Sequence, residues 1–232
     1  MKSKKEEALK LLSGEFETYS NLVLKQLRLL ETIFDMDSLS LIKEHFKEIK
    51  MQEKEINKFE VKVSERVINI IVLYSPVATE LRELMSIYRV SLDIEKIGDL
   101  VVNIVRSLKK IDDELVYQNF NEKISDILII SINMAEKALL SLNNKDMDYA
   151  VWTIRNDDVV DELHSSFIKK IMKKRLPHVK NPDELKSFIN LMNVVKYIER
   201  IADKATNIAE AAIYASMGKD VRHKNVNLDT MI

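Results

Sequence analysis

The sequence predicts an all-α protein made of two tandem three-helix bundle repeats, and three observations support this. Apolar residues recur at three- and four-residue spacing through nearly all of the 232 residues, which is the periodicity of amphipathic helices. The chain has only 3 Gly and 3 Pro, which are too few turn residues for a many-stranded β protein. Its second half also repeats the first. We therefore expect six long antiparallel helices with pseudo-twofold symmetry.

The six helices are predicted from their periodicity and from the breaks between them. Ser75-Pro76 separates the second helix from the third, because proline ends a helix or begins one. The charged segment "KKIDDEL" joins the third to the fourth, and Gly218 suits the position that follows the sixth. The predicted helices span residues 5–34, 38–74, 77–110, 116–142, 145–176 and 182–218. The predicted domains are a first repeat (1–111), a second repeat (112–218) and a C-terminal tail (219–232).

A single ungapped offset aligns the two halves. Ile94 and Ile198 are 104 residues apart (198 − 94 = 104), and the segments that they open, "IEKIGDLVVNIVR" and "IERIADKATNIAE", superimpose. An offset that holds over two helices of each half indicates an internal duplication, so that any site is expected twice. The same offset pairs Glu95 with Glu199, Asp99 with Asp203, Glu53 with Asp157, and Asn57 with Asp161.

These pairs form the candidate metal sites. Carboxylates at positions i and i+4 share one helix face and repel each other, whereas a lysine at the second position would form a stabilising pair. Clustered carboxylates without cysteine suit hard cations such as Mg²⁺, Ca²⁺, Mn²⁺ or oxidised iron, which would turn the repulsion into attraction. The alternative is a pair of solvated acidic faces without a ligand. The candidate ligands are Glu95, Asp99, Glu199, Asp203, Asp157, Asp161, Glu53 and Asn57.

Composition narrows the class of function. A net charge of −1 argues against a general nucleic-acid binder, and the absence of cysteine removes disulfides and thiolate sites. No segment approaches the roughly 18 apolar residues of a membrane span, and no apolar run follows the charged N-terminus. No catalytic motif is present. We expect a cytoplasmic protein that is not an enzyme.

Two further segments have alternative interpretations. "KKIMKKRLPHVK", residues 169–180, is the densest basic stretch. It either complements the dipole at a helix C-terminus or docks the protein on a transporter subunit or an anionic membrane surface. "DELH", ending at His164, is the nearest match to a di-iron Glu-x-x-His motif, but its counterpart in the first half is not histidine. His164 is therefore interpreted as a partly buried structural residue.

The doubled motif resembles the signature of the PhoU family of phosphate-transport accessory regulators. The resemblance is carried by "DIEKIGDLVVNI" (93–104), "YIERIADKATNI" (197–208) and "SPVATELREL" (75–84), and it covers nearly the whole chain. It implies a cytoplasmic all-α protein that restrains phosphate uptake and represses phosphate-starvation genes. The implied partners are the ATPase subunit of a phosphate ABC transporter and a sensor histidine kinase.

The resemblance also implies that the acidic pairs hold metal, with iron as the first candidate and manganese, magnesium, zinc or calcium as alternatives. Asn57 stands where the family pattern prefers a carboxylate, so we expect a weaker cluster in the first repeat. A homodimer is a further expectation, and contact with the membrane is expected only through partners. The alternatives to this function are a passive helical scaffold with solvated acidic faces and a metal-storage or di-iron bundle.

Overall fold

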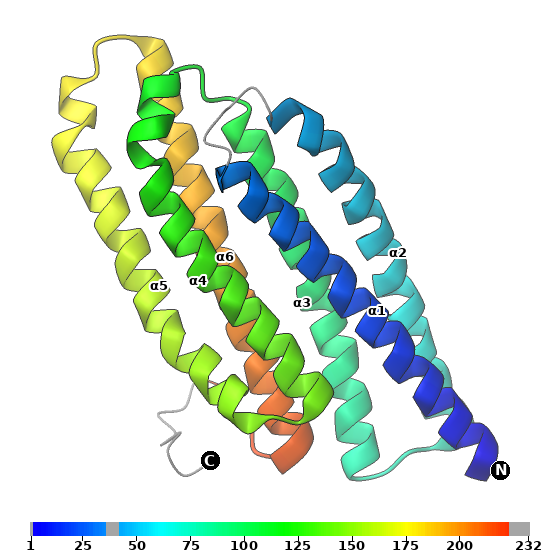
Figure 1. The fold of residues 1–232 in the computed structure, drawn as a ribbon. Coiled ribbons are helices and arrows are strands. Elements are labelled where there is room, and N and C mark those ends of the chain that lie inside the picture. Colours follow the sequence, from blue (N-terminus) through cyan, green and yellow to red (C-terminus); the bar gives the residue numbers. More distant parts are fainter. Residues whose placement is uncertain (1, 36–41, 223–232) are drawn as a thin grey trace.

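The computed structural model describes residues 2–35 and 42–222, and its regular elements are all helical over these ranges (Figure 1). Six long helices and one short 3₁₀ turn follow one another along the chain. Successive long helices run in opposite directions, and none of the described residues forms a strand. The elements are α1 (Lys2–Asp35), α2 (Ile42–Tyr74), α3 (Thr79–Leu108), α4 (Glu114–Asn144), α5 (Met147–Lys174), η1 (Leu176–His178) and α6 (Pro182–Met217).

The helix boundaries differ from the predicted ones by a few residues, for local reasons. Lys145 was predicted to begin the fifth helix, but it adopts a left-handed conformation (φ 58°) that ends α4. Asp146 then caps α5 by accepting a hydrogen bond from the Tyr149 amide. Ser75 and Ala78 also have positive φ, so that α3 begins at Thr79 rather than at 77. Residues 38–41 of the predicted second helix, and 223–232 of the predicted tail, lie outside the described residues.

The two repeats share one hydrophobic core. Helices α1, α2 and α3 form the first bundle, α4, α5 and α6 form the second, and α3 lies along α6 at the centre (Figure 1). The core positions of α3 and α6 keep the offset of the duplication, since both members of each pair are buried. The domain boundary predicted after residue 111 falls between α3 and α4. The buried pairs are Ile94/Ile198, Ile97/Ile201, Val101/Ala205, Ile104/Ile208, Val105/Ala209 and Leu108/Ala212.

Gly98 allows α3 to approach its neighbours closely. A Cβ atom at this position would lie 3.1 Å from Ile56 Cδ1 and 3.2 Å from Ile56 Cγ2 of α2. These distances are shorter than ordinary van der Waals contacts, so that a side chain here would require Ile56 to shift by a few tenths of an ångström. The duplicated position in α6 is Ala202, which is itself buried. Both repeats therefore have a small, buried residue at this place.

Two ion pairs with hydrogen bonds link neighbouring helices, one between α1 and α2 and one between α3 and α6. Arg66 of α2 donates two hydrogen bonds to the carboxylate of Glu15 in α1, at 2.9 and 2.8 Å. Lys204 of α6 donates a 3.0 Å hydrogen bond to Asp93 of α3 and so links the two repeats. Burial raises the pKa of the Asp93 carboxyl above its ordinary value, and Lys204 offsets part of this shift.

None of the helices described here is both long enough and apolar enough to cross a membrane. This agrees with the absence of a long apolar run in the sequence.

Candidate metal centre

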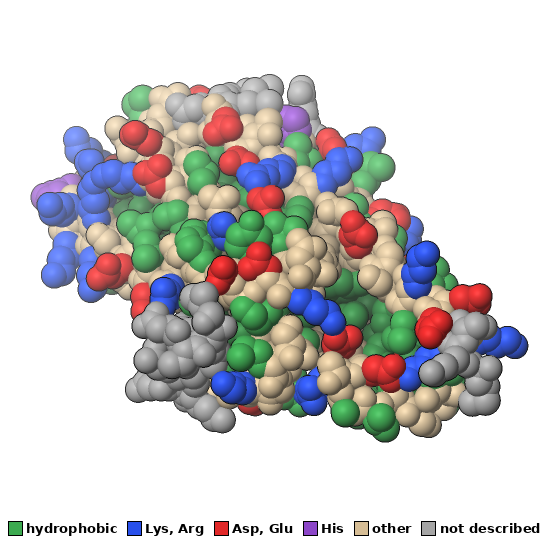
Figure 2. All heavy atoms as spheres, turned by 60° about the horizontal axis from the view of Figure 1, so that its bottom comes forward, with side chains coloured by type: hydrophobic (Ala, Val, Ile, Leu, Met, Phe, Trp, Pro, Cys, Tyr) green, Lys and Arg blue, Asp and Glu red, His purple; other side chains and the backbone are tan. Residues whose placement is uncertain are grey.

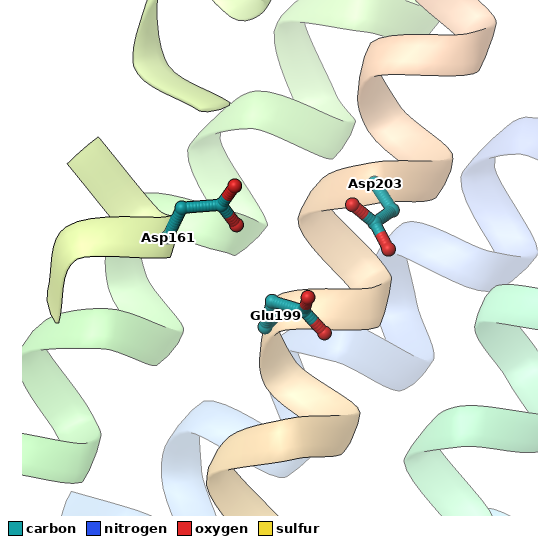
Figure 3. Close-up of side chains that lie close together, drawn as sticks. All are labelled: Asp161, Glu199 and Asp203. Atoms are coloured by element: carbon teal, nitrogen blue, oxygen red, sulfur yellow. The ribbon is translucent and has the colours of Figure 1, made fainter. Parts of the chain in front are cut away.

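Three carboxylates of the second repeat converge between α5 and α6 (Figure 3). Glu199 and Asp203 lie on successive turns of α6, and Asp161 points toward them from α5. Each of the three residues offers a carboxylate oxygen, and these oxygens lie within 4.8 Å of one another. The i, i+4 spacing places Glu199 and Asp203 on one helix face, and the packing of α5 on α6 supplies the third group. The structure thus brings together three of the four predicted ligands of this repeat.

The carboxylates disturb one another's ionisation. The pKa of Glu199 is raised from its ordinary value of 4.5 to about 7, first by burial and then by the negative charges of Asp203 and Asp161. Burial and the charge of Asp161 also raise the pKa of Asp203. Like charges that share a partly buried site disfavour full ionisation. A bound cation would remove this repulsion, so that the arrangement fits a hard metal ion.

Asp157, the fourth predicted ligand, lies one turn from Asp161 on α5 and is partly buried. Its Oδ1 accepts a 3.0 Å hydrogen bond from the Thr206 hydroxyl of α6. The pKa of Asp157 is raised by burial, and the charges of Asp203 and Asp161 add to the effect. No sequence pattern pointed to Thr206, because the duplicated position in α3 is Val102, whose side chain cannot donate a hydrogen bond.

The acidic pairs of the first repeat have different partners. Glu53 accepts a 2.8 Å hydrogen bond from the Asn57 amide nitrogen. The Lys96 ammonium lies 2.9 Å from a Glu95 oxygen and 3.7 Å from an Asp99 oxygen, so that a cation of the protein itself stands beside this pair. Among the described residues, the acids of the first repeat form no group of three like that of the second.

One atom of the first repeat nevertheless suits a cation. Asn57 Oδ1 is buried and has no hydrogen-bond partner among the described residues. A buried amide oxygen without a partner is costly, and such oxygens are ordinary ligands of hard cations. That the first repeat holds a weaker metal cluster, as the asparagine at this position predicts, stays a prediction.

The duplicated aspartates Asp99 and Asp203 line the same groove. Asp99 and Asn103 of α3 and Asp203 and Asn207 of α6 line one groove between these helices, together with Asp157. Arginine and lysine side chains share the groove, so that it is of mixed charge rather than purely acidic. The groove lining also includes Arg89, Lys96, Arg200, Lys204 and Arg222.

His164 lies at the edge of the carboxylate cluster. It is partly buried, as the sequence interpretation expected. Burial lowers its pKa, and the charges of Asp161 and Asp203 oppose that shift, which places the ring within electrostatic range of both. His164 is not one of the three converging groups, and a neutral imidazole beside them would be a further donor for a transition metal.

Comparison with known proteins supports the duplication and the fold. The family model described as the PhoU domain matches twice, over residues 16–108 and 124–212. A protein of Aquifex aeolicus named as a homologue of the phosphate-specific transport system accessory protein PhoU is 32% identical over 221 residues, which cover 93% of this chain and 97% of the relative. The Escherichia coli protein of that name is 28% identical over 172 residues, covering 74% of this chain and 69% of the relative.

Solved structures agree with the architecture. The crystal structure of PhoU from Pseudomonas aeruginosa superimposes with a TM-score of 0.73 at 21% identity, covering 92% of this chain and 99% of that one. The crystal structure of the phosphate transport system regulatory protein PhoU from Streptococcus pneumoniae gives a TM-score of 0.80 at 18% identity, covering 94% of this chain and 99% of that one. At these identities the two structures support the fold alone.

Proposed function

Because the chain belongs to the PhoU family, we propose that it is an accessory regulator of phosphate transport that acts through protein–protein contacts. In this proposal it works at the cytoplasmic face of a phosphate ABC transporter and contacts the ATPase subunit. It also contacts a sensor histidine kinase, restraining uptake and starvation signalling when phosphate is plentiful. No catalytic step is assigned to it.

The observation that carries this proposal is the match of the family over both repeats. The Aquifex aeolicus relative, named as an accessory protein of phosphate-specific transport, aligns with nearly the whole chain. Alignment over both repeats supports a shared role better than a shared fold would, since one fold serves many functions.

Co-purification tests the proposed partners. The tagged chain is expected to capture the ATPase subunit of the phosphate transporter of its own host, and not the ATPase subunit of a sugar transporter. Deleting its gene is expected to raise expression of a phosphate-starvation reporter in phosphate-rich medium, and a plasmid copy is expected to restore repression. Failure of both the capture and the reporter response would contradict the proposal.

We also propose that the carboxylate cluster holds a hard cation, with iron as the first candidate. Asp161, Glu199 and Asp203, with Asp157 beside them, are the ligands proposed in the second repeat. Bound metal there would neutralise the repulsion and fasten α5 to α6. In the first repeat the ligands proposed are Glu53, Asn57, Glu95 and Asp99.

Plasma mass spectrometry of the purified protein tests the metal. Metal in the wild type that is lost in Glu199→Gln/Asp203→Asn would support the proposed ligands of the second repeat. The duplicated pair of changes, Glu95→Gln/Asp99→Asn, tests the ligands proposed in the first repeat in the same way. Metal content near zero in all three proteins would favour the passive scaffold with solvated acidic faces. The homodimer expected from the sequence stays a prediction.

A further inference from the structure

One end of the second repeat carries a dense group of cations, which we call the basic tip. Most of its residues lie in the last turns of α5 and in the connection to α6, and Lys123 joins them from α4. Figure 2 shows lysine and arginine side chains gathered around a histidine along the left edge, the side on which α5 lies in Figure 1. The basic tip consists of Lys123, Lys169, Lys170, Lys173, Lys174, Arg175, His178 and Lys180.

Two carboxylates that line a cleft at the basic tip accept hydrogen bonds from backbone amides at helix starts. A cleft of about 500 Å³ lies here, and it contains Asp113 and Glu184 beside Lys174, Arg175 and His178. Asp113 accepts a 3.1 Å hydrogen bond from the Val116 amide, and Glu184 accepts a 2.9 Å hydrogen bond from the Lys180 amide. Within residues 2–35 and 42–222, none of the cations of the basic tip forms a salt bridge. Their positive charge is therefore available to an external anion.

The cations of the basic tip also crowd one another. The pKa of Lys170 is lowered from its ordinary value, first because the Lys123 ammonium lies beside it and then because Arg175 and Lys174 are close. Lys170 and Arg175 both lie over the Phe120 ring, at 5.8 and 5.7 Å from its centre. Two helices thus hold like charges together around one aromatic ring. An anion placed here would relieve their repulsion.

Exposed apolar side chains lie among these cations. Leu115 at the start of α4 is 71% exposed, and Met172 in the last turn of α5 is 57% exposed. Leu185 and Ile189, at the start of α6, are exposed on one face of that helix. Cations around apolar side chains are the combination that binds the headgroup region of an anionic bilayer.

The first repeat provides an internal comparison. It exposes apolar side chains at the duplicated positions: Ile68 corresponds to Met172, Leu81 to Leu185, and Met85 to Ile189. The lysines are not duplicated, since residues 65, 66, 69 and 70 are Glu, Arg, Asn and Ile where the second repeat has four lysines. The one cation among them, Arg66, is paired with Glu15. The positive charge is thus a property of the second repeat and not of the fold.

We propose that the basic tip docks directly on the surface of an anionic phospholipid bilayer, with Leu115 and Met172 entering the headgroup region. A lipid surface fits better than an acidic protein, because the cations come from two helices and a connecting turn at the end of a long bundle. At the end of the bundle these cations can all contact a flat membrane surface at the same time. This inference goes beyond the proposed function, does not depend on the partner proteins named there, and departs from the expectation that the chain contacts the membrane only through partners.

Co-sedimentation with vesicles tests the inference. The full chain is mixed with vesicles of phosphatidylcholine and phosphatidylglycerol in equal parts, and with vesicles of phosphatidylcholine alone. We expect binding to the anionic vesicles only, weakening as salt is raised. Each lysine near an anionic surface contributes about fivefold to the partition constant, so that Lys170→Gln/Lys173→Gln/Lys174→Gln is expected to weaken binding about a hundredfold.

The control is Lys4→Gln/Lys10→Gln/Lys25→Gln, which removes the same charge from exposed positions of α1 and is expected to bind like the wild type. A second variant, Leu115→Ser/Met172→Ser, is expected to bind more weakly without a change in salt dependence. All the changed side chains are exposed except that of Lys170, which is partly buried, and circular dichroism verifies that the variants are folded. The inference is overturned by an absence of binding to anionic vesicles, which would leave an acidic partner protein as the occupant. Equal loss in the two lysine variants would also overturn it, because net charge alone would then account for binding.

Discussion

Replacing Glu199 by Gln is expected to stabilise the metal-free protein near pH 8. The pKa of Glu199 is about 7 in the folded chain, against an ordinary value of 4.5. At about 1.4 kcal/mol per pKa unit, ionising this carboxyl would cost the folded state up to about 3 kcal/mol. Because Glu199 is only partly buried, solvent screening reduces this to about 1 kcal/mol. A change of this size raises the melting temperature of a chain of this length by about 2–4 °C.

The raised pKa of Glu199 also determines whether the free energy of unfolding rises or falls with pH. Between about pH 4.5 and pH 7 the folded state holds a proton on Glu199 that the unfolded chain has released, so that the free energy of unfolding falls as pH rises through this window. In the Gln variant this fall should be smaller, and below pH 4.5 the two proteins should be equally stable. Urea titrations in the presence of a chelator measure both effects.

Glu95→Gln is the matched control, since Glu95 is the duplicated residue and is paired with Lys96. It should give no gain near pH 8. The reasoning is refuted if Glu199→Gln leaves the pH profile unchanged, or if the control stabilises the chain as much as Glu199→Gln does.

Two further predictions concern the packing of the helices. Lys204→Met should lower the free energy of unfolding near pH 8 by about 3 kcal/mol, because it leaves the Asp93 carboxylate buried without its cation. The loss should be smaller in acid, where Asp93 is protonated. An equal loss at pH 4 and pH 8 would contradict this prediction. Gly98→Ala should lower stability by about 1 kcal/mol, since crowding of the new Cβ against Ile56 costs about 2 kcal/mol and the gain in helix propensity is about 1 kcal/mol. Gly14→Ala in α1 should raise stability by about 1 kcal/mol, because a Cβ added there has no neighbour within 4 Å. Thermal melts measure both glycine variants, and melting temperatures that shift in the same direction would contradict the two predictions.

Much of the fold could be predicted because it depends on patterns that repeat. The apolar period specified the six helices, and the offset between Ile94 and Ile198 specified the duplication, which the buried pairs of α3 and α6 reproduce. The errors lie at helix ends, where the backbone conformation of a single residue determines where the helix stops. Lys145 is a good helix former, but its left-handed backbone ends α4, and no periodic signal marks such a residue.

The candidate site was less predictable, because ligand geometry depends on contacts between helices. The i, i+4 spacing indicated that Glu199 and Asp203 share a face, and the duplication added Asp157 and Asp161. The spacing could not show that Lys96 reaches back to Glu95 and Asp99 in the first repeat. Nor could it show the hydrogen bond from Thr206 to Asp157, which joins α6 to α5 through residues 49 positions apart.

The contact between α3 and α6 has a consequence for how such a chain can arise. Either repeat alone would present a strip of apolar side chains along a 30-residue helix about 45 Å long. An ancestor with one repeat could cover that strip by pairing two-fold with a copy of itself, but only at a sufficient concentration of the protein. Joining two copies in one gene makes the pairing intramolecular and independent of concentration. It also frees the two halves to diverge, so that one tip could acquire lysines while the other did not.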